Sequence, residues 1–350
     1  MNNITLTKLT LVGLALLSMM LTGCNNSPEK AVTSKEVIAV ADTATDPLPS
    51  WNDGKSKQSI IEFVERVTKP GSPDFVPPEE RIATFDQDGT LWCEQPVVQM
   101  EFVIYQIKKM ALDHPEWKDQ LPYQAILEGD KSYLINDLTN NHGKELMKLF
   151  AATHTGMPLA EFDMEAKEFF NGSRHPKFKK MYTETIYQPM LELLQYLREH
   201  GFKTYICSGG GNDFMRVIAE DTYGIVPENV IGSFAMNTFQ QVDGSWKIVK
   251  DHKNLFINDK ETKPAAIEQR IGRIPIFVAG NVRTGGDIAQ LTYSETNSLP
   301  NFQLLINHDD DVREFAYAEK DNASLNAAEE GGWHVVSMKN DWLKIFPFEN

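Results

Sequence analysis

Four short apolar runs, each ending in polar residues and lying next to a segment with helical spacing, constrain this 350-residue chain more than any other feature. Short apolar runs bounded in this way are typical of buried strands. Strands that alternate with helices predict a parallel, doubly wound sheet, and therefore an α/β fold. The runs are "RIATFD" (81–86), "TYICSGGGNDF" (204–214), "IPIFVAGN" (274–281) and "FQLLINHDD" (302–310).

Polar side chains stand where these predicted strands end. In sheets of this type ligands bind outside the carboxyl ends of the strands. We therefore expect four strand-end residues to meet at one edge of the sheet, and this edge is the candidate site. They are Asp86, Ser208, Asn281 and His308.

A long segment without strand patterns, 91–187, separates the first two predicted strands, and it reads as helices. Its place in the chain favours a mainly helical cap over the edge of the sheet. A separate helical domain, unrelated to the site, is the alternative. The predicted organisation is a signal peptide (1–23), a tether (24–50), the start of the core (51–90), the cap (91–187) and the rest of the core (188–350).

The N-terminus has the features of a targeting signal. Lys8 precedes an apolar run that is too short to span a membrane and fits a signal peptide. "LTGC" (21–24) resembles the bacterial lipobox, which implies that Cys24 is lipidated and becomes the new N-terminus. An ordinary cleaved signal with a chance cysteine is the alternative. Asn25, rather than Asp, implies a lipid-anchored envelope protein that faces the periplasm from the outer membrane, by the sorting rule of Gram-negative bacteria.

The formal net charge of −15 argues against a nucleic-acid-binding protein, which would present a basic face. An anionic substrate would be repelled by the chain as a whole. Its site must therefore supply positive charge locally, from a metal, a lysine or a helix N-terminus. The remaining cysteines, Cys93 and Cys207, stand in apolar contexts, where we expect two buried thiols rather than a disulfide.

"FDQDGT" (85–90) resembles the D-x-D-G-T signature of the haloacid dehalogenase-like superfamily. Phosphatases of that superfamily add three further motifs in a set order, and this chain has a counterpart of each. These are Ser208 at the end of a strand, Lys263 at the start of a helix, and Asp287 in a late acidic loop. The resemblance covers about 81–307, and the stretch 188–221 looks most like phosphoserine phosphatases.

The resemblance implies a role for each matching residue. Asp86 would be the nucleophile that attacks phosphorus, and it would bind Mg²⁺ together with the backbone carbonyl of Asp88. The Asp88 side chain would protonate the leaving group and then activate water. Lys263 would neutralise the aspartyl phosphate. The turn and the phosphate oxygens would be held by Gly89, Thr90, Ser208, Gly209 and Gly210.

The last acidic motif departs from the family pattern. Asn281 and Asp287 stand six positions apart, where relatives often have four, so the resemblance leaves open which of them binds the metal. Arg283, between them, is a candidate phosphate contact or a solvated arginine. Glu94 stands near the place of a carboxylate that contacts the substrate amine in phosphoserine phosphatases.

Two further patterns favour structural roles. In "NHDDD" (307–311), His308 and Asp309 could lie beside the metal, but a helix N-cap at Asp309 or Asp310 is the plainer interpretation. The basic run "SRHPKFKK" (173–180) could attract an anionic substrate, although such runs are more often solvated surfaces.

The function that the resemblance implies is Mg²⁺-dependent hydrolysis of a small phosphomonoester, resembling phosphoserine, through an aspartyl phosphate. Asp88 argues against a dehalogenase, which needs no acid at that position. A phosphotransferase that uses the same intermediate is one alternative. The other is a binding lipoprotein without catalysis, against which stands the intact set of Asp86, Asp88, Ser208 and Lys263.

Overall fold

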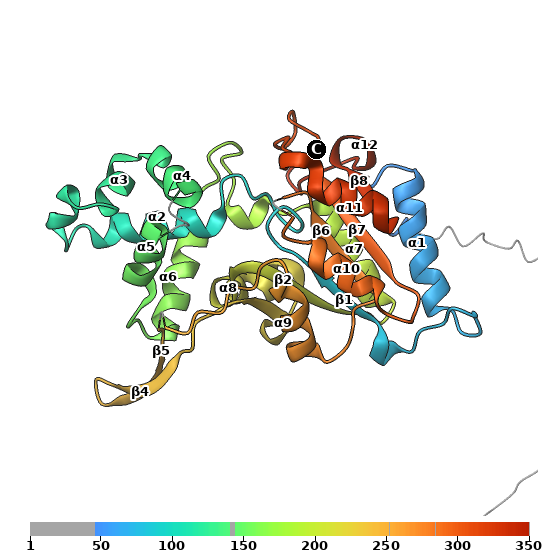
Figure 1. Cartoon of the computed structure of the whole chain (residues 1–350), viewed down its shortest axis with the longest axis horizontal. Helices are drawn as coiled ribbons and strands as arrows, with labels where there is room; N and C mark the ends of the chain where they lie inside the picture. The colour runs from blue at the N-terminus through green and yellow to red at the C-terminus, as the bar shows by residue number, and fades with distance from the viewer. Residues whose placement is uncertain (1–45, 141–143, 252, 284, 350) are drawn as a thin grey trace, which may run out of the picture. The chain divides into compact units, whose positions relative to one another are not determined.

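The structure, a computed structural model, describes residues 46–140, 144–251, 253–283 and 285–349. Within these residues the main sheet has six parallel strands in the order β3-β2-β1-β6-β7-β8 (Figure 1). The predicted doubly wound α/β fold is therefore confirmed. The strands are β1 (Ile82–Phe85), β2 (Lys203–Gly211), β3 (Val230–Ser233), β6 (Phe277–Asn281), β7 (Phe302–Asn307) and β8 (His334–Ser337).

Helices cover both faces of this sheet because successive strand side chains point to opposite faces. In β6, Phe277 and Ala279 pack in one core with α1, α7 and α8, whereas Val278 packs in another with α10 and α11. The helix α9 covers the latter face beside β2 and β3. The helices around the sheet are α1 (Lys55–Thr68), α7 (Gln188–Glu199), α8 (Asn212–Tyr223), α9 (Thr262–Ile271), α10 (Ile288–Glu295), α11 (Ala323–Gly331) and α12 (Met338–Asp341).

The segment between β1 and β2 forms a helical cap, drawn in cyan and green to one side of the sheet in Figure 1. Val103, Ile107 and Leu149 belong to an apolar core of the cap itself. Phe102 and Phe170 instead pack against Phe214 of α8, with ring centroids 5.0 and 4.8 Å apart. The cap helices are α2 (Val98–Met110), α3 (Tyr123–Glu128), α4 (Lys131–Asn140), α5 (Lys144–His154) and α6 (Leu159–Gly172).

The two ends of this insertion lie side by side. The Cys93 N–H donates to the Thr185 carbonyl at 2.9 Å, and the Tyr187 N–H donates to the Leu91 carbonyl at 2.9 Å. Trp92 also forms an antiparallel bridge with Ile186. We call these two paired segments the stem; they join the cap to the core just beyond β1.

An antiparallel hairpin, β4 (Thr238–Val242) and β5 (Ser245–Val249), packs against α6 of the cap (Figure 1). Its turn has positive φ at Asp243 and Gly244, the conformation that two-residue hairpin loops favour. The Gly156 N–H donates to the Lys250 carbonyl at 2.9 Å and ties the end of the hairpin to the cap. The cap thus includes a segment from the second half of the chain, which the sequence analysis did not anticipate.

The predicted signal peptide (1–23) and Cys24 lie outside the described residues. None of the helices in the described ranges is both long and apolar enough to cross a bilayer. Cys93 and Cys207 are buried free thiols.

Candidate active site

A cavity of about 780 Å³ lies at the carboxyl edge of the sheet, between the core and the cap. Thr90 is fully buried next to it, and its hydroxyl lies 3.3 Å from the amide nitrogen of Asn281. His308 does not line the cavity. Of the four predicted strand-end residues, Asp86, Ser208 and Asn281 therefore line the cavity together. The other predicted site residues that line it are Asp88, Glu94, Gly209, Gly210, Lys263 and Asp287.

Lys263 joins two buried carboxylates at the floor of the cavity. Its position in the first turn of α9 brings Nζ within 3.1 Å of Asp86 Oδ1 and 2.5 Å of Asp287 Oδ1. Burial, together with the nearby Asp287 carboxylate, raises the pKa of Asp86 to about 8, although Lys263 opposes this. Burial alone would lower the pKa of Lys263, but the two carboxylates raise it overall. The site therefore holds a fixed cation beside Asp86.

Asp287 is turned toward Lys263 and the backbone. Its Oδ2 accepts the Asn281 N–H at 2.9 Å, and its Oδ1 also accepts from Gln290 at 2.6 Å. This approach is possible because residue 280 is glycine: a Cβ there would lie 2.5 Å from the Cβ of Asp287. Both oxygens of Asp287 are therefore already occupied by protein donors.

The turn after β1 aims Asp88 at the cavity. Gly89 has φ of +72°, a conformation that favours glycine, and its carbonyl lies 2.8 Å from His308 Nε2. His308 therefore braces the turn. The Asp88 carboxylate accepts the Trp92 indole N–H at 2.7 Å, and burial raises the pKa of Asp88. Asp88 is thus held beside Asp86 in surroundings that favour a bound proton.

Asn281 faces the oxygens that a metal ion would need. Its Nδ2 lies 2.7 Å from the Asp88 carbonyl and 3.5 Å from Asp86 Oδ2. Its Oδ1 is buried and has no hydrogen-bond partner among the described residues. The two ends of an amide exchange by rotation about χ2, and that rotation would turn three oxygens toward one point. Such oxygens fit Mg²⁺, although the described residues contain no group of three or more His, Cys, Asp or Glu side chains placed to hold a metal ion by themselves.

Backbone N–H groups surround the other side of the cavity, where β2 ends. The Ser208 hydroxyl is buried and accepts the Gly210 N–H at 3.3 Å. The Gly211 N–H donates to Gln99 Oε1 of α2 at 2.8 Å, so a cap residue holds the end of β2. Gln99 was not predicted from the sequence. Its side chain faces the core only because of how α2 is rotated about its own axis, which no local pattern indicates.

Glu94 and Arg283 bind each other in the wall of the cavity. The Glu94 carboxylate is 2% exposed, forms an ion pair with Arg283, and accepts the Tyr317 hydroxyl. Burial raises the pKa of Glu94, although Arg283 opposes this. Arg283 is thus half-buried and ion-paired at the edge of the cavity.

The remaining candidates lie away from the cavity. Asp310 accepts the N–H groups of Val312 and Arg313 and caps a turn, not the α-helix expected there. Asp309 accepts the Ser337 hydroxyl at 2.6 Å. The basic run 173–180 does not line the cavity.

Comparisons with known proteins agree with this geometry. A model of the haloacid dehalogenase-like hydrolase family matches residues 83–272. Among solved structures, a conserved functionally unknown protein from Anaerococcus prevotii has a TM-score of 0.53 and 16% identity over 84% of this chain and 94% of its own, which shows a shared fold. No curated protein matches the sequence significantly.

Two solved structures whose names state a function have lower TM-scores. A phosphoserine phosphohydrolase-like protein from Francisella tularensis has a TM-score of 0.40 and 19% identity, over 73% of this chain and 94% of its own. A probable phosphoserine phosphatase from Vibrio cholerae has a TM-score of 0.35 and 13% identity, over 74% of this chain and 68% of its own.

Proposed function

Because the chain belongs to the haloacid dehalogenase-like hydrolase family, we propose that it is a Mg²⁺-dependent phosphatase that hydrolyses a small phosphomonoester. The observation that carries the proposal is that Asp86, Asp88, Lys263 and Ser208 line the same cavity. A binding protein without catalysis would have no need for a buried cation and two carboxylates aimed at the same point.

Asp86 is the nucleophile in this proposal. Its carboxylate attacks phosphorus, the ester oxygen leaves, and an aspartyl phosphate forms. The attack needs the ionised carboxylate, whereas burial raises the pKa of Asp86 to about 8. Lys263, 3.1 Å away, supplies part of the positive charge that favours the ionised form.

Asp88 moves the protons. Its raised pKa, caused mainly by burial, suits a carboxyl that donates a proton to the departing alkoxide. The resulting carboxylate then accepts a proton from the water that hydrolyses the aspartyl phosphate, which restores both side chains. The Trp92 indole N–H, bound to Asp88 Oδ1, keeps the other oxygen aimed at the cavity.

The proposed ligands of Mg²⁺ are Asp86, the Asp88 carbonyl and the Asn281 side-chain oxygen. A bound Mg²⁺ would shield the phosphate charge from the incoming carboxylate. Asp287 would then act through Lys263, which it holds, rather than as a ligand. Ser208 and the N–H groups of Gly209 and Gly210 would hold the phosphate oxygens.

The test is phosphate release by the full chain in detergent, from a panel of phosphomonoesters, with Mg²⁺ or with EDTA. We expect release only with Mg²⁺, a fall to background in Asp86→Asn, and a loss of roughly 10²- to 10⁴-fold in Asp88→Asn. Asp113→Asn, an exposed carboxylate on the cap, is the matched control and should change nothing. Equal release from Asp86→Asn and the unmodified chain would overturn the mechanism.

A further inference from the structure

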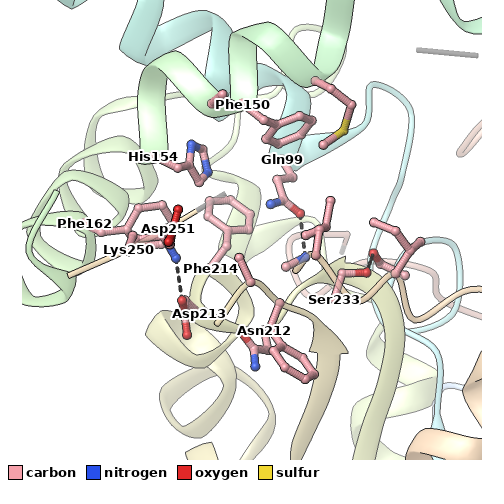
Figure 2. A pocket seen from close by; sticks show the side chains of 18 residues that line it. Gln99, Phe150, His154, Phe162, Asn212, Asp213, Phe214, Ser233, Lys250 and Asp251 are labelled. Atoms are coloured by element: carbon pink, nitrogen blue, oxygen red, sulfur yellow. Dashed lines mark hydrogen bonds and ion pairs between the residues drawn. The ribbon is translucent and has the colours of Figure 1, made fainter. Parts of the chain in front are cut away.

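A second cavity, of about 330 Å³, adjoins the catalytic one, and we call it the side cavity (Figure 2). Four residues line both cavities, so the two meet along a common boundary: Gln99, Phe150, Gly209 and Ile257. Gly209 directly follows Ser208, the proposed phosphate contact. If the phosphate of a substrate binds at Ser208, the side cavity can therefore hold the rest of the substrate, the group attached to that phosphate.

Aromatic rings form much of the wall of the side cavity. Phe150 and His154 come from α5, Phe162 from α6 and Phe214 from α8 (Figure 2). The His154 ring lies 5.0 Å from Phe162 and 5.5 Å from Phe150, centroid to centroid. Rings at such distances leave edges and faces on which a further ring can pack.

The charged residues that line the side cavity are Lys250, Asp213 and Asp251, and each of them already interacts within the protein. Lys250 Nζ forms an ion pair with Asp213 Oδ2 at 2.5 Å and lies 4.2 Å from the centre of the Phe162 ring. Burial and the nearby Lys250 lower the pKa of His154 to about 3, so its ring is neutral at neutral pH. His154 Nε2 is also buried without a hydrogen-bond partner among the described residues. The side cavity therefore suits an uncharged group.

The catalytic cavity, in turn, lacks a free cation among its described lining residues for the carboxylate of an amino acid. A carboxylate or a second phosphate would need a free cation. The cations among the described lining residues, Lys263 and Arg283, are both ion-paired with acids.

We propose that the substrate is a phosphomonoester of an alcohol that carries an aromatic ring, with the ring bound in the side cavity. This inference rests on the proposed function and narrows its substrate class away from phosphoserine. The space is sufficient, because a cavity of about 150 Å³ is known to hold benzene. Gln99, on the boundary, would lie beside the linker between the ring and the phosphate.

The test compares esters of primary alcohols that differ in the attached group: 2-phenylethyl phosphate, ethyl phosphate and O-phosphoserine, with the full chain and Mg²⁺. We expect kcat/KM for 2-phenylethyl phosphate to exceed that for ethyl phosphate by roughly tenfold or more, since the ring is buried. Ala151 lines the side cavity, so Ala151→Phe should reduce this ratio toward one. Ala152→Phe, a neighbour on α5 that does not line it, should leave both values unchanged.

The outcomes separate the two proposals. Hydrolysis of all three esters at similar rates, or a preference for phosphoserine, would overturn the ring assignment and leave the phosphatase intact. If no ester were hydrolysed, the proposed function would fail. Calorimetry with 3-phenylpropylphosphonate and propylphosphonate then decides the side cavity: tighter binding of the phenyl compound that Ala151→Phe abolishes would support it, and equal binding would overturn it.

Discussion

At the scale of single residues, Lys263 is the cation that neutralises two buried carboxylates. It is 2% exposed and lies between Asp86 and Asp287, so its loss would leave two carboxylates buried side by side. We expect Lys263→Met to lower the free energy of unfolding by about 3–5 kcal/mol, as when one member of a buried ion pair is removed. Urea unfolding measures this. Lys167→Met, an exposed lysine on α6, is the control, and an equal effect of both would contradict the interpretation.

Asn281 offers a test of the proposed metal ligands. We expect Asn281→Ala to raise the Mg²⁺ concentration for half-maximal activity roughly tenfold or more. The loss of a residue that only orients a metal ligand already lowers metal affinity by about this factor. Asn281→Asp should bind Mg²⁺ at least as well as the unmodified chain, because it offers a charged oxygen. Calorimetric titration with Mg²⁺ gives the same comparison without turnover, with the exposed Asn171→Ala as control. Unchanged Mg²⁺ affinity in Asn281→Ala would exclude Asn281 as a ligand.

At the scale of secondary-structure elements, the Gln99–Gly211 hydrogen bond joins cap helix α2 to the last residue of β2. A Cβ at residue 211 would lie 2.7 Å from Gln99 Nε2, so Gly211→Ala should displace Gln99 and break the bond. We expect Gln99→Ala and Gly211→Ala each to cost about 1 kcal/mol in unfolding free energy. The double variant should cost no more than one of them, because both remove the same contact.

Thermal or urea unfolding of the unmodified chain, the two single variants and the double variant measures the coupling between Gln99 and Gly211. Gln195→Ala, an exposed glutamine on α7, shows the cost of losing a glutamine that does not join two elements. Fully additive effects of Gln99→Ala and Gly211→Ala would show that the two residues act separately.

The elements that could be predicted from the sequence are those with strong local signals. Strands β1, β2, β6 and β7 were predicted because their apolar runs are long or end in motifs. The four-residue strands β3 and β8 were missed, since neither Val230–Ser233 nor His334–Ser337 is long enough to stand out. The β4–β5 hairpin was not predicted, although the Asp243-Gly244 pair between two runs rich in β-branched and aromatic residues is a local signal for it.

The candidate site could be predicted in part for a similar reason. Polar residues at strand ends meet whatever the details of packing, so their convergence follows from the topology. Glu94 and Arg283 stand 189 positions apart, and their pairing depends on how the stem and the loop after β6 approach each other. No local pattern encodes such an approach. The aromatic wall of the side cavity could not be predicted for the same reason, because its rings come from three separate helices, α5, α6 and α8.

At the scale of the whole molecule, we propose that a lipid on Cys24 anchors the chain in the outer membrane, facing the periplasm. In a Gram-negative host we expect Cys24→Ser to move the protein from the membrane fraction to the soluble or uncleaved pool, and to abolish labelling by radioactive palmitate. Asn26→Ser, which leaves the "LTGC" motif intact, should remain labelled and membrane-bound. Palmitate labelling of Cys24→Ser would contradict the anchor.

The stem has a consequence for how such a molecule can change. Because Cys93 and Thr185 are hydrogen-bonded neighbours, the chain enters and leaves the inserted cap helices at one place beside the sheet. Long insertions between close ends cost little additional chain entropy. The inserted cap helices can therefore change in sequence and length, and with them the substrate that is bound, while the catalytic residues at the strand ends keep their positions.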